Sequence, residues 1–321
     1  MASFGYTMMC EQSPAGALVG DLQAAERAGF DFSVISDHYQ PWLVSQGHSP
    51  YAWAVLGAAA ASTERIPLMT YVTCPIMRYH PVVVAQKAAT VQALSGGRFR
   101  LGLGAGERLN EHVTGVPWPS AGVRHEMLAE AVEMIRALLE GKTVNHHGPH
   151  FHADRARLWD PPDEQVPIGI AVSGRESCRL AGQHADVMIA VEPKPELGEL
   201  FDAAGGAGKP RVGQLAVCYD ADRDAAIARA HEQFRWFGLG WKVNAELPNP
   251  DAFDAASASV TPQDVAAGIP CGPDVDEHVE HVKAFLDAGF DEIALVQVGA
   301  WNQTEFIDWA ERELLPALRA L

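Results

Sequence analysis

The side chains best suited to acid–base chemistry are Asp37 and His38, with Trp42 four residues further on. Histidine is the side chain whose ordinary pKa lets it take or give a proton near neutral pH. The pair directly follows the apolar run 32–35, as expected where a buried strand ends at a site. Taken alone, the pattern also fits a strand that ends in a capped turn, so the role of His38 depends on what lies beside it.

Polar residues also follow two further apolar runs: a carboxylate follows one of them, and two serines follow the other. Glu107 directly follows the glycine-rich run 102–106, where a flat ligand could approach the backbone closely. A carboxylate in that place can exchange a proton or stabilise a positive charge. Ser173, Gly174 and Ser177 open a predicted helix, and hydroxyl groups with backbone N–H groups at a helix start can hold a phosphate. The alternatives are an ordinary tight turn and an ordinary capped helix.

These residues need a scaffold, and the chain alternates short apolar runs with amphipathic stretches. The expected strands are 4–8, 32–35, 66–70, 99–103, 168–172, 187–190, 212–219 and 292–298. The expected helices are 16–28, 50–62, 82–94, 124–139, 176–183, 195–204, 222–237, 275–288 and 305–318. Eight such units predict an α/β protein with one domain, a (β/α)8 TIM barrel over residues 1–321. A doubly wound sheet usually has a glycine-rich phosphate turn after its first strand, and no such turn follows Met8.

In a TIM barrel the residues just after each strand form the active-site face. That rule collects the candidate residues Glu11, Asp37, His38, Trp42, Tyr71, Val72, Thr73, Cys74, Gly104, Gly106, Glu107, Asn110, Ser173, Gly174, Lys194 and Gln297.

Two segments interrupt the alternation. The first, residues 142–158, contains four histidines within residues 145–152, which suggests a metal site. Because it has no cysteine and only one carboxylate, Asp154, the sequence favours a surface hairpin that turns at Gly148-Pro149, with no metal. The second segment, residues 238–272, is irregular, with short helical pieces around Phe253 and Val265.

The amino-acid composition disfavours several classes of binding partner. The formal net charge of −17 disfavours nucleic acid and anionic membranes as partners. No window approaches the roughly 18 apolar residues of a membrane span. The five cysteines are scattered and never spaced as CxxC, and the N-terminus lacks a basic region before an apolar run. These features predict a cytoplasmic protein without disulfides.

Four motifs in register resemble one enzyme family, the luciferase-like oxidoreductases that use the deazaflavin coenzyme F420, and within it the glucose-6-phosphate dehydrogenase subgroup. Residues 36–42 match S-D-H-[FY]-Q-P-W, and Glu11-Gln12 match an E-Q pair after strand one. Residues 72–81 match V-x-x-P-x-x-R-Y-x-P, and residues 104–111 match G-x-G-E-x-L-N-E. The likeness covers nearly the whole chain.

This resemblance implies coenzyme F420, no metal, and a homodimer. His38 would be the catalytic base, with Trp42 and Glu107 beside the reacting centre. The coenzyme would contact Asp37, Tyr71, Val72, Cys74, Gly106, Asn110, Ser173, Gly174, Glu176 and Ser177, the last four at its phosphate. A cis peptide bond would fall between Tyr71 and Val72. Substrate contacts would come from Glu11, Lys194 and Trp241.

Departures from the subgroup bear on the substrate. The dehydrogenases hold a sugar phosphate with a threonine, two lysines and an arginine. Here the threonine position is Val191, one lysine remains as Lys194, and no basic residue stands at 253–259 or near Gly268. Lys242 or Arg235 could substitute. Together with the resemblance, these departures predict hydride transfer between a CH–OH group of a small alcohol or sugar-like substrate and C5 of the deazaflavin, and they disfavour a sugar 6-phosphate.

Two alternatives stand beside this hypothesis. One is an FMN-dependent luciferase-like monooxygenase on the same barrel. The other is a barrel that binds a ligand without turning it over, which the intact His38 and Glu107 disfavour.

Overall fold

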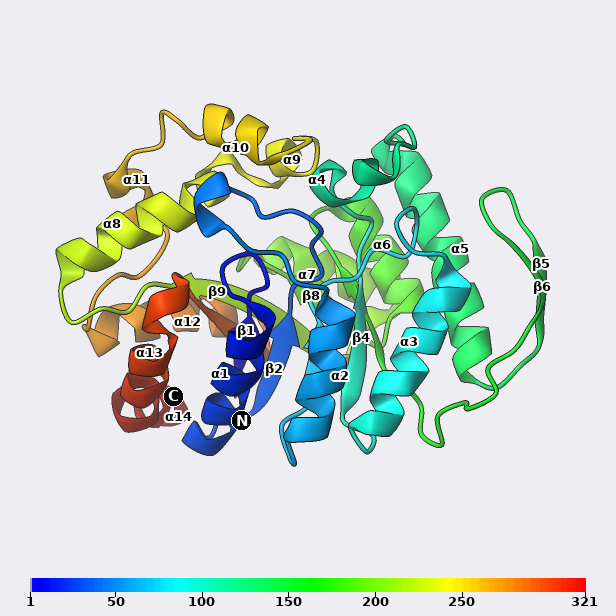
Figure 1. Cartoon of the computed structure of the whole chain (residues 1–321), viewed down its shortest axis with the longest axis horizontal. Coiled ribbons are helices and arrows are strands. Elements are labelled where there is room, and N and C mark those ends of the chain that lie inside the picture. Colours follow the sequence, from blue (N-terminus) through cyan, green and yellow to red (C-terminus); the bar gives the residue numbers. More distant parts are fainter. Residues whose placement is uncertain (1) are drawn as a thin grey trace.

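Eight parallel strands close into a barrel in the computed structural model, which describes residues 2–321 (Figure 1). Around the barrel the strands follow the order β1 (Ser3–Met8), β10 (Glu292–Gln297), β9 (Arg211–Val217), β8 (Val187–Ala190), β7 (Ile168–Ala171), β4 (Phe99–Leu103), β3 (Leu68–Thr70) and β2 (Phe32–Ile35). Every predicted strand is present, with bounds shifted by two residues at most. The (β/α)8 TIM barrel is therefore confirmed.

Helices cover the outside of the barrel or lie over the carboxyl ends of its strands (Figure 1). They are α1 (Ala15–Ala28), α2 (Ala52–Ser62), α3 (Pro81–Leu94), α4 (Arg108–Glu111), α5 (Ala121–Leu139), α6 (Arg175–His184), α7 (Pro195–Phe201), α8 (Arg223–Phe234), α9 (Trp241–Asn244), α10 (Pro250–Ala256), α11 (Pro262–Ala266), α12 (Val275–Asp287), α13 (Gln303–Trp309) and α14 (Leu315–Arg319). Helices α4 and α9 were not predicted, because four residues are too few for an apolar period to show.

Three predicted helices are divided. The helix expected over 195–204 ends at Phe201 and continues as a π turn, Asp202–Gly206. The helix expected over 222–237 ends at Phe234 and continues as a 3-10 turn, Arg235–Leu239. The helix expected over 305–318 contains a π turn, Ala310–Leu314, between α13 and α14. Pro316 stands near the start of α14 and has no N–H to donate to the preceding turn, which accounts for the change of helix type there.

Apolar side chains from several strands fill the barrel interior. Phe32, Val34, Met69, Ile189 and Val212 pack there. Gly102 allows β3 and β4 to approach closely, since a Cβ atom at that position would stand 1.9 Å from the carbonyl oxygen of Thr70. The packed interior makes the strand ends rigid positions for side chains that carry chemistry.

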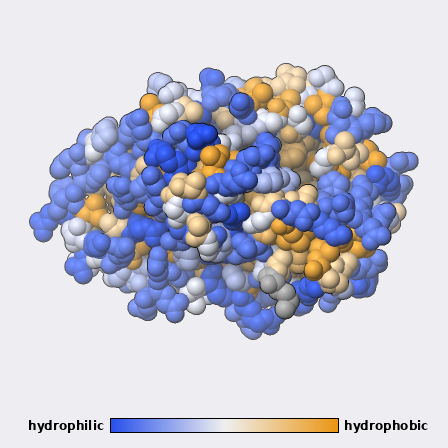
Figure 2. Space-filling model, turned by 180° about the vertical axis from the view of Figure 1, so that it is seen from behind, coloured by the Kyte–Doolittle hydropathy of each residue, from blue (hydrophilic) through white to orange (hydrophobic). Residues whose placement is uncertain are grey.

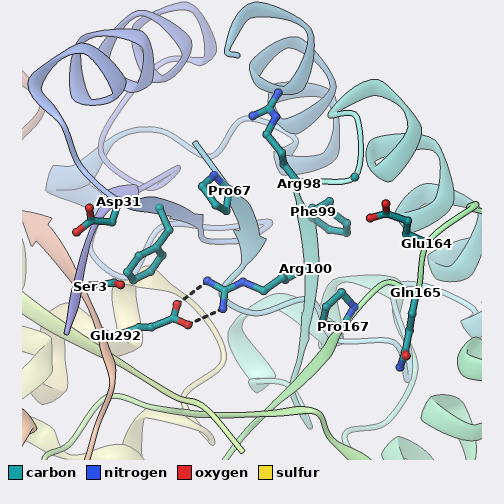
Figure 3. A pocket seen from close by; sticks show the side chains of 12 residues that line it. Ser3, Asp31, Pro67, Arg98, Phe99, Arg100, Glu164, Gln165, Pro167 and Glu292 are labelled. Carbon is teal, nitrogen blue, oxygen red and sulfur yellow. Dashed lines mark hydrogen bonds and ion pairs between the residues drawn. The ribbon is translucent and has the colours of Figure 1, made fainter. Parts of the chain in front are cut away.

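An ion pair crosses the barrel at the amino ends of the strands. Arg100 of β4 donates two hydrogen bonds, of 2.9 and 2.6 Å, to the carboxylate of Glu292 on β10, the strand on the opposite side of the barrel (Figure 3). The pair borders a cavity of about 540 Å³. A second arginine there, Arg98, is bound to the backbone carbonyl oxygens of Ala60, Thr63, Ile66 and Ser95. Both arginines that line this cavity therefore already have hydrogen-bond partners within the protein.

The histidine-rich segment forms a two-stranded antiparallel sheet, β5 (Val144–His147) and β6 (His152–Ala156). It stands away from the barrel at one side of the molecule (Figure 1). His146 lies 2.7 Å from a carboxylate oxygen of Glu130 on α5, which ties the hairpin to the barrel. Within residues 2–321 no three His, Cys, Asp or Glu side chains are grouped so that they could hold a metal ion.

The two ends of the barrel differ in what covers them. The short helices α9, α10 and α11 run along the top of the view in Figure 1, above the carboxyl ends of the strands, whereas both termini lie at the other end. The face seen from behind is mostly hydrophilic, with apolar side chains in separate patches (Figure 2). None of the helices in the described residues is long and apolar enough to cross a membrane.

Candidate active site

His38 lies between two carboxylates at the carboxyl end of the barrel. Its Nδ1 atom is 3.0 Å from Glu11 Oε1, and its Nε2 atom is 3.3 Å from Glu107 Oε2. His38 is 9% exposed and Glu11 is 1% exposed, so water screens neither charge strongly. Strands β1 and β2 pair in parallel and end together, which brings Glu11 and His38 into contact.

The carboxylates set the protonation state of His38. Burial by itself lowers the pKa of His38, but the negative charges of Glu11 and Glu107 outweigh burial and raise the pKa to about 9. For Glu11, burial raises the pKa, and the charge and hydrogen bond of His38 outweigh it, so the pKa of Glu11 is lowered. Burial and the charge of Glu11 raise the pKa of Glu107 despite the nearby His38. Near neutral pH the site therefore holds a protonated imidazole.

Glu11 is held in place from its other side. Its Oε2 atom accepts a hydrogen bond of 2.6 Å from the Ser36 hydroxyl, which also accepts the backbone N–H of Cys10. We expected Glu11 to contact the substrate. In the structure its two carboxylate oxygens lie against Ser36 and His38, and a contact with the substrate stays a prediction.

The Asp37 carboxylate accepts hydrogen bonds from side chains of α2 and of the segment between β3 and α3. One of its carboxylate oxygens accepts hydrogen bonds from Trp53 Nε1 and the Thr73 hydroxyl, at 3.0 and 2.7 Å. The other accepts from Arg78 and the Tyr79 hydroxyl, at 3.1 and 3.2 Å. Because donors within the protein occupy the buried carboxylate, Asp37 fixes the end of β2 next to His38. These hydrogen bonds give the Asp37 side chain a structural role, and the coenzyme contact that the resemblance implied for it stays a prediction.

The Asn110 side chain holds the backbone that follows His38. Its side-chain oxygen accepts the backbone N–H groups of Tyr39 and Gln40, at 2.8 and 3.2 Å. Its amide nitrogen donates to Glu107 Oε2 at 2.9 Å. Asn110 thereby links the segment that carries His38 to the carboxylate that faces it.

Trp42 packs against His38, with ring centroids 4.8 Å apart and ring planes inclined at 55°. Its side chain is 5% exposed. The indole N–H forms no hydrogen bond within residues 2–321 and is not sealed inside the protein, so it is free to donate to a ligand.

Glycines and small side chains form the surface beside these groups. A Cβ atom at Gly104 would stand 2.6 Å from Val72, and one at Gly106 would stand 2.5 Å from Cys74 Sγ. Gly106 also has a φ of 79°, which favours glycine. The peptide bond between Tyr71 and Val72 is cis, as the resemblance implied. The hydroxyl of Tyr71 donates to the carbonyl oxygen of Ala190 within the barrel.

The start of α6 leaves room for an anion. A Cβ atom at Gly174 would meet nothing within 4 Å. The Ser177 hydroxyl accepts the backbone N–H groups of Ser173 and Gly174, at 3.0 and 3.2 Å, and so caps the helix from within. Glu176 pairs with Arg179 on the surface. Of the four residues expected at a phosphate, Ser173 and Gly174 keep an open approach, and Ser177 shapes the turn.

Two of the three basic side chains that could bind a sugar phosphate already form ion pairs with carboxylates. Lys194 lies 2.8 Å from Glu192 and is 55% exposed, and Arg235 is bound to Asp254. Lys242 is exposed on α9 next to Trp241, which packs against the apolar cluster of the 238–272 segment. No hydrogen bond or ion pair within residues 2–321 joins Lys194 or Ser173 to the group around His38.

Two contributors to the site were missed. Gln46 accepts the backbone N–H of Trp42 at 2.8 Å, and Arg78 lies between Asp37 and Glu111, 3.1 and 3.5 Å away. Arg78 belongs to the matched motif of residues 72–81, but nothing in the sequence pairs it with Asp37 or Glu111. No local pattern marks Gln46, because its partners depend on how the 42–46 turn folds.

The closed barrel makes this a TIM-barrel protein, and the carboxylate–histidine–carboxylate group at its carboxyl end is a candidate acid–base site. Comparison of the sequence with known protein families identifies the family. The model of the luciferase-like monooxygenase family matches residues 4–296. The chain therefore belongs to the luciferase-like family.

Individual relatives agree over the full length. The F420-dependent glucose-6-phosphate dehydrogenase of Beutenbergia cavernae is 36% identical, over 100% of this chain and 98% of the relative. The F420-dependent hydroxymycolic acid dehydrogenase of Mycobacterium tuberculosis is 36% identical, over 98% of this chain and 88% of the relative. An F420-dependent secondary alcohol dehydrogenase, solved with an F420-acetone adduct, superposes with a TM-score of 0.90 at 28% identity, over 99% of both chains.

Proposed function

We propose that this protein is an F420-dependent oxidoreductase that transfers a hydride between the CH–OH group of a small alcohol and the deazaflavin. The single observation that carries the proposal is the position of His38 between Glu11 and Glu107, 3.0 and 3.3 Å away. Removal or delivery of a hydroxyl proton is the step that such a histidine can perform. The full-length relatives named as F420-dependent dehydrogenases support the coenzyme.

The residues present fit the coenzyme. The open approach at Gly174, the Ser173 hydroxyl and the first backbone N–H groups of α6 suit a phosphate. Gly104 and Gly106 have no side chains and let Val72 and Cys74 pack directly against the turn after β4, and the flat ring would lie against this turn. When bound, the deazaflavin accepts or donates the hydride at its C5 atom.

The chain's own residues handle the proton. In the oxidative direction, neutral His38 takes the hydroxyl proton of the alcohol, and the free N–H of Trp42 donates to the developing negative oxygen. Glu11 holds the imidazole through Nδ1, so Nε2 faces Glu107 and the reacting group. Glu107 stabilises the imidazolium. In the reductive direction, the imidazolium returns the proton to the oxygen.

The raised pKa of His38 gives the two directions opposite pH preferences. With a pKa of about 9, His38 is protonated near neutral pH and is ready to donate. Reduction of a carbonyl group is then favoured at neutral pH, and oxidation of an alcohol is favoured above about pH 9.

An uncharged substrate suits the site better than a sugar 6-phosphate. Lys194 and Arg235 are paired with carboxylates, and the position expected to be threonine is Val191. Aromatic side chains of the 238–272 segment and its flank, including Trp236 and Phe253, pack around Trp42. The hydroxymycolic acid dehydrogenase and the secondary alcohol dehydrogenase among the relatives are named for alcohols without a phosphate.

The alternative is an FMN-dependent monooxygenase. It draws on the family description and on a monooxygenase from Streptomyces bottropensis with the same fold, at 19% identity and a TM-score of 0.76. A likeness at that identity concerns the fold alone. Titration of the protein's tryptophan fluorescence with F420 and with FMN separates the two hypotheses, because only the true coenzyme should quench it at low micromolar concentration.

The deciding experiment is a screen of alcohols, sugars and sugar phosphates for reduction of F420. We expect turnover with secondary alcohols and none with glucose 6-phosphate. Lack of F420-dependent turnover with every alcohol, and with the corresponding carbonyl compounds plus reduced F420, would contradict the proposal. We further propose a cytoplasmic homodimer, which light scattering of the purified protein tests for the oligomeric state.

A further inference from the structure

Trp42 is stacked on a residue far away in the sequence. The ring centroids of Trp42 and Trp236 are 4.1 Å apart, and the ring planes differ by 9°. Phe253 of α10 packs edge-on against Trp42, with centroids 5.1 Å apart and planes at 80°. Trp42 is thus placed between His38 and two aromatic side chains from the region after α8.

The backbone of Trp42 is attached to the same region. The backbone N–H groups of Trp42 and Leu43 donate to the Gln46 side-chain oxygen, and the Gln46 amide donates to the carbonyl oxygen of Gln233 at 3.0 Å. The Gln233 amide donates in turn to the carbonyl oxygen of Ser45 at 3.2 Å. These reciprocal bonds fix the 42–46 turn against the end of α8, so Trp236 and Trp42 meet in a defined geometry.

The indole of Trp236 is not explained by stability alone. Its N–H group is buried and has no hydrogen-bond partner within residues 2–321. Leaving a buried donor unpaired is unfavourable, and a phenylalanine would avoid that cost while it filled most of the space. The N–H of Trp42, by contrast, remains open to a ligand. The two stacked rings therefore have different tasks: one faces the site and the other supports it.

We propose that Trp236 is a positioning residue, which fixes the ring plane of Trp42 and thereby the direction of the Trp42 N–H beside His38. The inference rests on the proposed function, because Trp42 matters for turnover only if its N–H meets the reacting oxygen. Without a stacked partner the Trp42 ring is free to tilt. Misplacement of a catalytic group by about 1 Å can slow a reaction by roughly 100-fold.

Three variants separate this role from packing. Trp236→Leu removes the stack, Trp236→Met removes it with a more flexible side chain that can refill the space, and Trp236→Phe keeps a smaller aromatic face. Phe237→Leu is the matched control, since Phe237 packs edge-on against Trp236 at 5.8 Å and forms no aromatic contact with Trp42. Thermal unfolding of each variant shows which of them are folded, and Trp236→Met replaces Trp236→Leu if the leucine variant is unfolded.

The first readout needs neither coenzyme nor substrate. The His38 ring lies 4.8 Å from the Trp42 ring, so the aromatic ring current shifts its Cε1–H resonance. In protein with labelled histidine, a His38→Asn variant identifies that signal among the 13 histidines. We expect the signal to move in Trp236→Leu, to stay near its original position in Trp236→Phe and to be unchanged in Phe237→Leu. An unchanged signal in Trp236→Leu and Trp236→Met overturns the proposal.

The second readout is kinetic. In Trp236→Leu we expect kcat to fall about 10- to 100-fold with little change in the Kd for F420, and we expect Trp236→Phe to restore most of it. Wild-type kcat in both stackless variants overturns the inference and leaves the proposed function intact. If the wild-type protein shows no F420-dependent turnover, the proposed function fails, and the histidine resonance still decides whether Trp236 positions Trp42.

Discussion

Glu11 Oε1 lies 3.0 Å from His38 Nδ1, and the carboxylate is almost completely buried. The charge of Glu11 therefore acts on His38 with little screening by water. Glu11 also determines which imidazole nitrogen is left for the reacting group, since it occupies Nδ1. We therefore predict that Glu11 sets the acid–base behaviour of His38.

Replacement of Glu11 by Gln should move the pH dependence of the reaction to lower pH. A pKa raised to about 9 means that oxidation, which needs neutral His38, rises with pH up to about 9, while reduction declines above that value. Loss of one of the two carboxylates brings the pKa of His38 closer to its ordinary value of about 6.5. Profiles of kcat against pH in both directions measure the shift, and an unmoved midpoint contradicts this role of Glu11.

Asp37 should matter mainly for stability. In Asp37→Asn the four donors from Trp53, Thr73, Arg78 and Tyr79 lose a charged acceptor, and Arg78 loses a buried counter-charge. We expect the free energy of unfolding to fall by about 3–5 kcal/mol. Urea unfolding followed by circular dichroism measures it. Glu176→Gln, which breaks the exposed pair with Arg179, is the control and should change stability by less than about 1 kcal/mol.

The ion pair between Arg100 and Glu292 should stabilise the barrel without affecting the reaction, because it lies at the amino ends of β4 and β10. Both side chains are largely buried, 17% and 18% exposed. A double-mutant cycle with Arg100→Met and Glu292→Gln should give a coupling energy of about 1–3 kcal/mol. Its matched control is the exposed pair of Lys142 and Glu140, for which we expect a coupling near zero. A large loss of kcat in a folded variant would show that the two ends of the barrel are coupled.

A negative charge at the start of α6 should weaken coenzyme binding. Ser173→Asp places a carboxylate where we propose the coenzyme phosphate, so the Kd for F420 should rise at least about tenfold by repulsion. The riboside form of the deazaflavin, which has no phosphate, should bind the variant and the wild type equally. Fluorescence titration measures both constants. Equal weakening for both ligands would point to a distorted fold, and no weakening for F420 would remove the phosphate from this position.

The pattern of apolar and polar residues along the sequence predicted the strands of the barrel, but it predicted only part of the candidate site. The strands from Phe32 and Phe99 were placed correctly because an apolar run that stops at polar residues is visible in the sequence itself. The contact between Glu11 and His38 depends on the register of β1 against β2, and no local pattern encodes that register. The stack of Trp236 on Trp42 depends on where the region after α8 folds back. The partner of the Asn110 side chain, the backbone of Tyr39, is 71 residues away in the sequence, whereas Ser177 caps its own helix.

The most direct test of the central claim is the turnover of His38→Ala with F420 and a secondary alcohol that the wild-type protein oxidises, measured at pH 9 together with the Kd for F420. We expect kcat to fall by about 100- to 10,000-fold, the usual contribution of a general acid–base group, while the Kd for F420 stays within about twofold. A variant that keeps wild-type kcat would contradict the assignment of the proton transfer to His38.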